Sequence, residues 1–171
     1  MYMLLDKSQK IVDLQARPFT VAAPYVWEAV PDGMTPIHGL LFIDGALVNP
    51  LYPTLDAARL FQKKALGEMC RAQIIGGFSS GATGSLLFYA STNIDQRNMA
   101  QRAQSDGGLL ACQNAAGVWA RLEHTQVQAQ AVLRDFVKFC DGLRAELTEL
   151  EAQIDAATTI EQVMALCFAP G

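Results

Sequence analysis

Short apolar runs separated by polar turns fill the first fifty residues. Met3–Leu5 and Ile11–Leu14 are apolar and flank the turn-like stretch Asp6–Lys10, so two short strands joined by a turn are predicted. Tyr25–Val30 is rich in strand-forming residues and predicts a third strand. Because four prolines interrupt residues 18–36, a long helix is excluded from this region.

A hairpin is predicted near the end of this first region. Asp44-Gly45 lies between the two apolar halves of Leu40–Val48, and Asp-Gly in such a place is the strongest short hairpin signal. A proline-bounded segment, Pro50–Pro53, follows and reads as a linker. We therefore expect residues 1–52 to form a small β-rich module.

The composition changes after the linker, from Pro-rich to Ala-, Leu- and Gln-rich. Thr54 is a good N-cap, and the spacing of apolar residues predicts a helix that runs to about Ile75 and ends at Gly76-Gly77. Residues 53–171 are predicted to form a second, mixed domain, so the fold class is α+β.

The middle of the chain mixes strand and helix signals. Leu86–Tyr89 predicts a strand, and the polar Asn93–Gln104 permits a helix. Gly107-Gly108 predicts a turn. Leu109–Cys112 and Val118–Leu122 then predict a second hairpin.

One long amphipathic helix is predicted from about residue 124 to residue 156. From Ala129 onward, apolar residues alternate in steps of four and three, which is an unbroken heptad seam. We expect the seam to mediate helix packing or an interface through Leu133, Phe136, Cys140, Leu143, Leu147, Leu150 and Ile154.

A short final helix is predicted beyond the long one. Thr158-x-x-Glu161 is a capping-box pattern that opens a helix over about residues 159–168. This helix is expected to fold back on the long helix but is too short to cover the whole seam. A second copy of the chain or another protein is therefore the expected partner for the remainder.

Composition excludes some function classes and favours protein contacts. Hydrophobic residues make up 51% of the 171 residues and charged residues 18%, so a folded core is expected and some apolar surface is available to a partner. The net charge of −4 argues against nucleic acid and anionic membranes as partners. No apolar run reaches the roughly 18 residues of a membrane span.

The sharpest enzymatic motif is Gly77-Phe78-Ser79-Ser80-Gly81, which matches the G-x-S-x-G nucleophile elbow. Asp95 or Asp106 and then His124 follow in the order of a serine hydrolase triad. The elbow requires a strand before it and a helix after it, and the predicted order here is the reverse. We therefore interpret the stretch as a glycine-rich loop and keep a small serine hydrolase as an alternative.

No cofactor or metal is expected. Gly76 and Gly81 have phosphate-loop spacing, but Ala82 occupies the position of the lysine that contacts the phosphates. His38 and His124 have no ligand at metal spacing near them, and His124 is interpreted as a helix cap or a surface residue. The four cysteines are widely spaced and are interpreted as small buried hydrophobic residues.

Motifs in a fixed order along the chain carry a family resemblance. Over residues 55–168 they are a helix with a basic end at Arg71, a strand at Tyr89, an Asp-x-x-Asn turn at Asp95–Asn98, a tryptophan strand at Val118–Ala120, a helix that begins at His124, and the closing segment 156–162. This order resembles a C-terminal domain of undefined function that is common in phage and prophage tail gene clusters. Trp27–Gly33 and Ile43–Pro50 are similar to stretches of tail-fibre assembly proteins.

The resemblance implies a non-enzymatic tail protein. It would act in tail-fibre assembly or attachment as a chaperone, a cap or a minor virion component, with a permanent tail or baseplate subunit as the alternative. Its partner would be the tail fibre or another tail protein. Its location would be the host cytoplasm during assembly, or the virion tail. The family supplies no catalytic residues.

Overall fold

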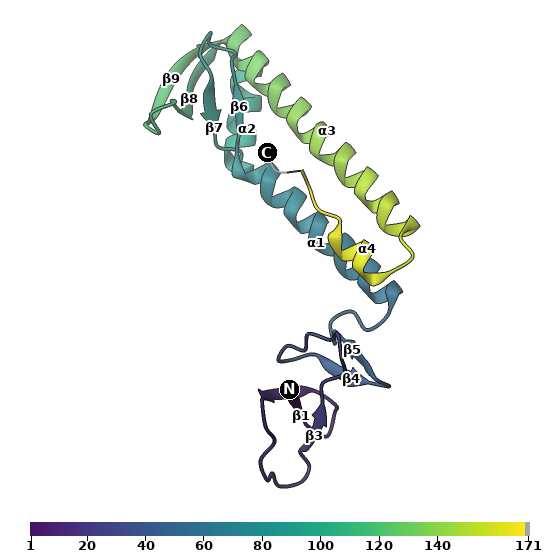
Figure 1. Cartoon of the computed structure of the whole chain (residues 1–171). Helices are drawn as coiled ribbons and strands as arrows, with labels where there is room; N and C mark the ends of the chain where they lie inside the picture. The colour runs from purple at the N-terminus through teal and green to yellow at the C-terminus, as the bar shows by residue number, and fades with distance from the viewer. Residues whose placement is uncertain (170–171) are drawn as a thin grey trace. The chain divides into compact units, whose positions relative to one another are not determined.

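A computed structural model describes Met1–Ala169 and has an α+β fold (Figure 1). The chain forms two compact units. The first comprises Met1–Gln62 with Ala157–Met164, and the second comprises Lys63–Ala156 with the segment that starts at Ala165. In the described part of the chain, no helix combines the length and the apolarity that crossing a bilayer requires.

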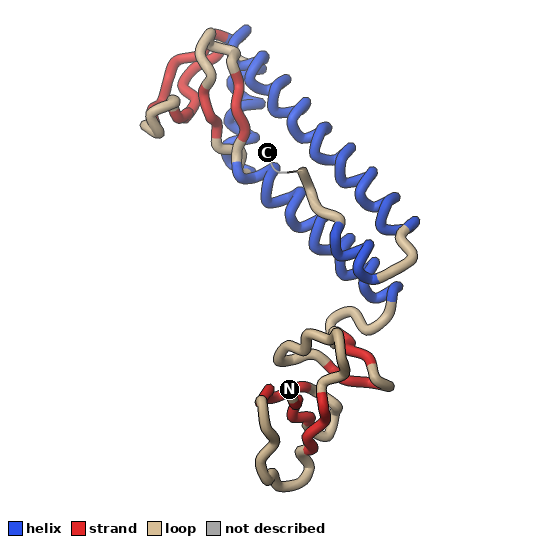
Figure 2. The backbone as a smooth tube through the Cα atoms, viewed as in Figure 1, coloured by secondary structure: helices blue, strands red, loops and turns tan. Residues whose placement is uncertain are grey.

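The first unit contains a three-stranded antiparallel sheet in the order β2-β1-β3 (Figure 2). Its strands are β1 (Tyr2–Leu5), β2 (Ile11–Gln15) and β3 (Val26–Ala29). The β1–β2 hairpin is confirmed, and Asp6 closes its turn by accepting the Lys10 backbone N–H at 3.1 Å. The predicted third strand is also confirmed and pairs with β1.

A separate hairpin follows, made of β4 (Leu41–Ile43) and β5 (Ala46–Val48). Asp44 and Gly45 have φ values of 50° and 78°, the left-handed conformation that a tight hairpin turn requires. The hairpin prediction is confirmed. Met3, Leu5 and Ile11 form the local core, packed against half-buried Leu14, Val30, Leu40, Phe42 and Leu47.

The first helix, α1 (Leu55–Gly76), begins and ends where the sequence predicts. The Thr54 hydroxyl accepts the Ala57 N–H at 3.2 Å as the N-cap. The second half of α1 packs antiparallel to α3 (Gln126–Ala156) (Figure 1). Lys63 and Asp155 join the two helices through an ion pair of 2.7 Å.

The second unit contains a four-stranded antiparallel sheet in the order β6-β7-β8-β9. Its strands are β6 (Phe78–Ser80), β7 (Leu87–Tyr89), β8 (Gly107–Gln113) and β9 (Trp119–Thr125). The glycine-rich loop prediction is wrong, because Phe78–Ser80 pairs with β7. The turn predicted at Gly107-Gly108 is also wrong, since both glycines pair with β9.

The second helix, α2 (Asn93–Gln104), confirms the helix-permissive reading of that stretch. Thr92 is its N-cap, and its hydroxyl and backbone exchange hydrogen bonds with Asp95 in a capping box. The Asp-x-x-Asn turn implied by the resemblance is wrong, because Asp95 and Asn98 lie in the first turns of this helix.

The core of the second unit lies between the sheet and the helices α2 and α3. Aromatic and aliphatic residues of the strands meet the first half of α3 here, and Met99 of α2 joins them. The buried members are Phe78, Leu87, Tyr89, Met99, Leu110, Cys112, Ala129, Val132, Phe136 and Cys140.

The two helices near the C-terminus differ in how well their bounds were predicted. Residues 124 and 125 were both candidate starts of the long helix, and Thr125 is the N-cap of α3, where it forms reciprocal hydrogen bonds with Gln128. The last helix, α4 (Ile160–Ala165), ends before Phe168, so the longer helix predicted there is wrong. Its capping residues are Thr159 and Gln162, one position after the predicted pair.

Candidate protein-interaction surface

The strand β9 is a long and exposed edge of the four-stranded sheet. Its seven residues pair with β8 on one side, and no described strand pairs with the other side. Only His124 is buried, while the other six residues are exposed. An edge strand of this kind presents unpaired backbone N–H and C=O groups, which can accept a strand from another chain.

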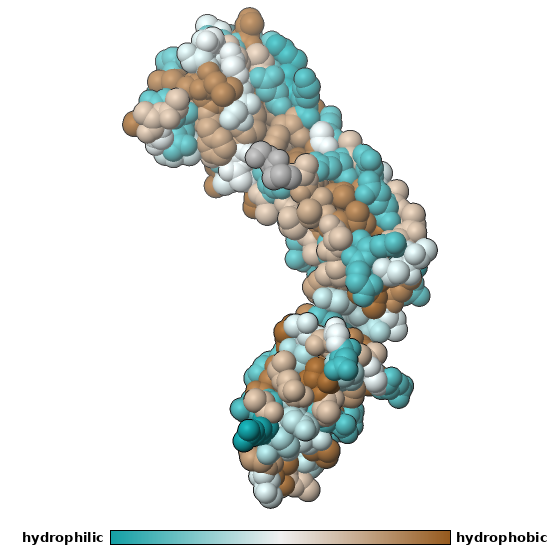
Figure 3. Space-filling view, in the orientation of Figure 1, coloured by the Kyte–Doolittle hydropathy of each residue, from teal (hydrophilic) through white to brown (hydrophobic). Residues whose placement is uncertain are grey.

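A hydrophobic patch lies at the end of this edge where β9 begins. We define the patch as Leu86, Phe88, Val118 and Trp119. Phe88 and Trp119 contact each other edge to face, with ring centroids 6.0 Å apart. Leu86, Val118 and Trp119 are 70%, 58% and 49% exposed. Figure 3 shows hydrophobic surface gathered over this sheet. Exposed apolar side chains at a free strand edge are typical of protein-binding surfaces.

Two opposite charges stand on the same face of β9. Arg121 lies opposite Ala111 of β8, and Glu123 lies opposite Leu109, so neither charge has a charged neighbour across the β8–β9 hairpin. Among the described residues, neither side chain forms an ion pair. Both are exposed. Neither charge is neutralised by an ion pair within the described residues, although the Arg121 side chain also lines a small pocket beside β8.

His124 holds β9 to the interior through a buried hydrogen bond. Its Nε2 lies 2.8 Å from the Tyr89 hydroxyl, and its Nδ1 lies 2.8 Å from the Leu122 carbonyl oxygen. Since a carbonyl only accepts, Nδ1 carries the proton and Nε2 accepts the Tyr89 O–H. Burial raises the pKa of Tyr89 to about 12, so the phenol remains a donor at neutral pH.

The candidate hydrolase residues do not form a triad. Both ring nitrogens of His124 are taken by Tyr89 and Leu122, so neither is directed at Ser79. Ser79 is exposed on β6, and Asp106 is exposed at the turn before β8. The Asp95 carboxylate accepts the Thr92 backbone N–H in the capping box of α2. The interpretation of His124 as a cap or surface residue is also wrong, because its side chain is 2% exposed.

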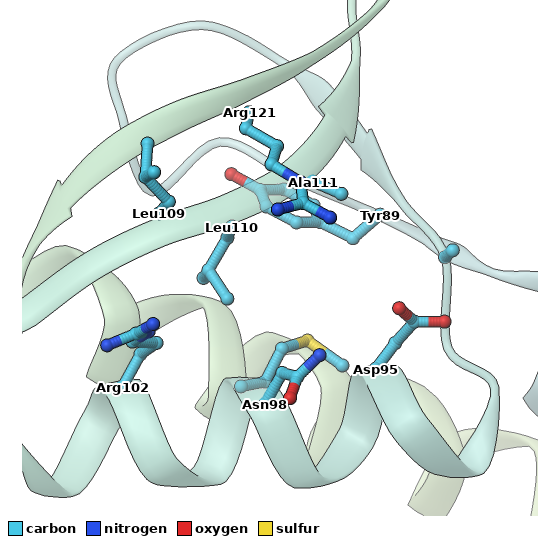
Figure 4. A pocket seen from close by; sticks show the side chains of 10 residues that line it. Tyr89, Asp95, Asn98, Arg102, Leu109, Leu110, Ala111 and Arg121 are labelled. Carbon is cyan, nitrogen blue, oxygen red and sulfur yellow. The ribbon is translucent and has the colours of Figure 1, made fainter.

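One small pocket lies where β7 and β8 diverge, above α2 (Figure 4). The two strands pair at Phe88 and Gln113, after which β7 leads into α2. The pocket measures about 230 Å³ and mixes Arg102 and Arg121 with Asp95, Asn98 and apolar groups. This is below the roughly 300 Å³ of ordinary small-molecule sites.

The predicted seam of α3 is buried unevenly. Phe136, Cys140, Leu150 and Ile154 are buried, whereas Leu133, Leu143 and Leu147 are half-buried. The second half of α1, which runs antiparallel to α3, contributes the buried side chains of Leu66 and Cys70. The sequence predicted that the first half of α3 packs within the domain, but it named the final helix and external partners, and not α1, as the cover for the second half.

The basic residues of α1 are largely engaged within the chain. Lys63 pairs with Asp155, Lys64 with Glu68 at 4.0 Å, and Arg59 with Asp56 at 2.9 Å. Such pairs at exposed positions contribute little to stability, but they leave no concentrated basic surface on this helix.

Cysteines and potential metal ligands provide no separate site. Cys70, Cys112 and Cys140 are free and buried, as predicted, whereas Cys167 is exposed and contradicts the prediction. Burial raises the pKa of the Cys112 and Cys140 thiols, which disfavours the reactive thiolate. Within residues 1–169, no three His, Cys, Asp or Glu side chains gather in a way that could hold a metal ion.

Comparison of the chain with family models, with curated proteins and with solved structures yields no match. The exposed edge β9 and the hydrophobic patch beside it are therefore the features from which a function is argued.

Proposed function

We propose that this chain is a non-enzymatic bacteriophage tail protein that acts through protein–protein contacts in tail-fibre assembly or attachment. It serves as a chaperone, a cap or a minor virion component. The order of motifs that resembles phage tail proteins supports the biological setting. The observation that carries the mode of action is the hydrophobic patch beside the free edge β9.

The fibre chain that such a protein would bind has exposed surfaces before it assembles. Fibre chains that have not yet trimerised expose strand edges and apolar side chains, which aggregate unless they are covered. The hydrophobic patch of Leu86, Phe88, Val118 and Trp119 offers apolar cover. Burial of apolar surface favours association without demanding one fixed orientation, which suits a transient assembly complex.

Co-expression with a phage tail-fibre protein tests the proposal. The matched variants are Leu86→Asp in the patch and Leu60→Asp on α1, because the two leucines are 70% and 73% exposed and neither substitution removes a core side chain. We expect the wild type and Leu60→Asp to raise the yield of soluble fibre trimer and to co-purify with it. Leu86→Asp should do neither.

Mass spectrometry of purified particles separates the versions of this role. A chaperone leaves the particle, whereas a cap, a minor virion component or a permanent tail or baseplate subunit is found in it at a fixed copy number. If the fibre yield is unchanged by the wild type and the particles lack the protein, the proposal is wrong. Labelling with a serine-reactive fluorophosphonate tests the hydrolase alternative, for which we expect no label on Ser79.

A further inference from the structure

We propose that β9 pairs antiparallel with β9 of a second copy of this chain, in a two-fold register centred on Leu122. This joins two four-stranded sheets into one continuous sheet. The inference concerns self-association and stands independently of the proposed role in tail-fibre assembly.

The free edge of β9 is long enough to template another strand. It has seven residues, all regularly paired with β8 on the other side, so its backbone already has the extended conformation that strand pairing requires. The other edge strand, β6, has three residues. Natural sheets usually shorten or cover their edges, and an uncovered edge of seven residues is an exception that a partner strand would resolve.

The charges on β9 specify the register. Trp119, Arg121, Glu123 and Thr125 share one face of the strand, because successive side chains alternate. When Leu122 faces its own copy, Arg121 of each chain lies directly opposite Glu123 of the other. The dimer then gains two cross-strand ion pairs from four charges, two in each copy, that form no ion pair within the described part of their own chain.

Neighbouring registers are unfavourable. A two-fold axis at Arg121 places that arginine opposite itself, and an axis at Glu123 places two carboxylates together. Like charges directly opposite each other destabilise a strand pair. A register whose two-fold axis lies midway between two adjacent residues reverses the faces, so the core side of one sheet would continue into the solvent side of the other. Among these registers, only the one centred on Leu122 places opposite charges across from each other and keeps the core faces of the two sheets on the same side.

The other face of β9 fits the same register. Leu122, which is 40% exposed, meets Leu122 of the second copy and loses this exposed apolar surface. His124 lies opposite Ala120, whose small side chain does not obstruct the buried imidazole. The interface is isologous, so each favourable contact away from the axis occurs twice.

A second copy is favoured over a fibre strand as the partner, because the charges of β9 are complementary to those of an identical strand. The strand carries both members of each ion pair in the order that a two-fold axis requires. A client strand would need the reverse arrangement of charges in its own sequence. Pairing with a fibre segment alone is therefore an outcome that the experiment distinguishes.

Sedimentation velocity of the full chain over a range of concentrations tests the register. The variants are Arg121→Glu, Glu123→Arg and the double swap Arg121→Glu/Glu123→Arg. Each single swap turns both cross-strand ion pairs into repulsive pairs, so we expect dimerisation to weaken by about tenfold or more. The double swap restores opposite charges and should dimerise about as well as the wild type.

Mixing the two single variants gives a second readout. In a mixed dimer, the Arg121→Glu chain carries two carboxylates on this face of β9 and the Glu123→Arg chain carries two guanidinium groups, so every cross-strand pair is attractive. We expect the mixture to form dimers that neither variant forms alone at the same concentration. Because both positions are exposed, circular dichroism and thermal melting should match the wild type and show that all variants fold.

Three results would overturn the inference. The wild type could remain monomeric up to millimolar concentration, the single and double swaps could dimerise equally, or the mixture could fail to associate. A monomeric chain that still raises the yield of fibre trimer would leave the proposed function intact and refute self-pairing alone. If the charge variants dimerise as expected but the wild type has no effect on the yield of fibre trimer, self-pairing is supported and the proposed function is refuted.

Discussion

The two edge strands of the four-stranded sheet differ in almost every respect. The strand β6 has three residues, and its Phe78 and Ser80 are buried. Phe78 packs against Phe136 of α3 at 5.2 Å between ring centroids, and the Ser80 hydroxyl donates to Asp135 at 2.5 Å. The strand β9 has seven residues, of which only His124 is buried.

This difference indicates where a partner can bind. The side chains of β6 tie it to the long helix, and its short edge offers few backbone groups to another chain. Besides its pairing with β8, the strand β9 is held by one buried hydrogen bond between His124 and Tyr89, and its other residues are exposed. Because one edge of this sheet is protected and the other is free, a further strand can add only at the β9 edge.

The largest effect should come from removing the anchor of β6. Phe78→Ala deletes an aromatic side chain that is 3% exposed, and we expect the free energy of unfolding to fall by about 3–5 kcal/mol. Trp119→Ala, on the half-exposed end of β9, should cost about 1 kcal/mol or less. Denaturant unfolding measures both. Equal losses would show that β9 is as deeply packed as β6.

Next in size is a backbone clash that would separate β8 from β9. Gly107 has a φ of +95°, and a Cβ there would collide with the carbonyl oxygen of His124. We expect Gly107→Ala to cost on the order of 2–3 kcal/mol from strain and displacement. Gly117→Ala is the control, since its φ is +79° but the nearest atom to its Cβ lies 3.8 Å away. Chemical denaturation should place the control near about 1 kcal/mol.

Alkaline pH should weaken the hydrogen bond that anchors β9. The pKa of Tyr89 is about 12 in the folded chain and about 10 when unfolded. The folded state therefore retains a proton that the unfolded state releases, so stability is full below about pH 10 and falls as the pH rises toward 12. The loss should be on the order of 2 kcal/mol.

Unfolding of the wild type and of Tyr89→Phe at about pH 9 and about pH 11.5, on either side of the unfolded pKa, measures this loss. The variant is less stable at the lower pH, because His124 Nε2 loses its donor, but its stability should change less with pH. Some dependence remains from Cys112 and Cys140, whose pKa values burial also raises. An identical slope in both proteins would contradict the assignment to Tyr89.

The smallest predicted contrast lies within β6 itself. Ser80→Ala removes the donor to Asp135 and should cost about 1 kcal/mol. Ser79→Ala, at the exposed neighbouring position, should change stability by less than about 0.5 kcal/mol. A melting series of both variants checks this. A larger effect at Ser79 would assign that serine a contact that the structure does not contain.

Local signals in the sequence were sufficient for much of the fold. Thr54 marks the start of α1, and Asp44-Gly45 marks the β4–β5 turn, because capping and left-handed turns depend on residues close in sequence. The heptad spacing likewise predicts α3. The residues that determine these elements lie close together in the sequence.

Other elements depend on residues far away in the chain. Phe78–Ser80 reads as a loop because Gly and Ser surround it, yet α3 and β7 make it a strand. Gly107-Gly108 reads as a turn, but only glycine permits its close approach to His124 and to the Arg102 side chain. Tertiary contacts override local preference at both places.

The candidate interaction surface could be predicted only in part from the sequence. The alternation of Trp119, Arg121 and Glu123 with Ala120 and Leu122 is a strand pattern in the sequence. That this strand forms an edge follows from the sheet order, which no local pattern contains. The Tyr89–His124 bond joins residues 35 positions apart and has no local signal either.

Amide hydrogen exchange across a concentration series tests the central claim most directly, since it reports pairing of β9 without any substitution. We predict that peptides covering residues 119–125 exchange more slowly as the chain is concentrated, while peptides covering residues 78–80 are unchanged, because only β9 gains a new strand partner. Exchange of β9 that is the same at every concentration, and the same with fibre protein added, would contradict the account.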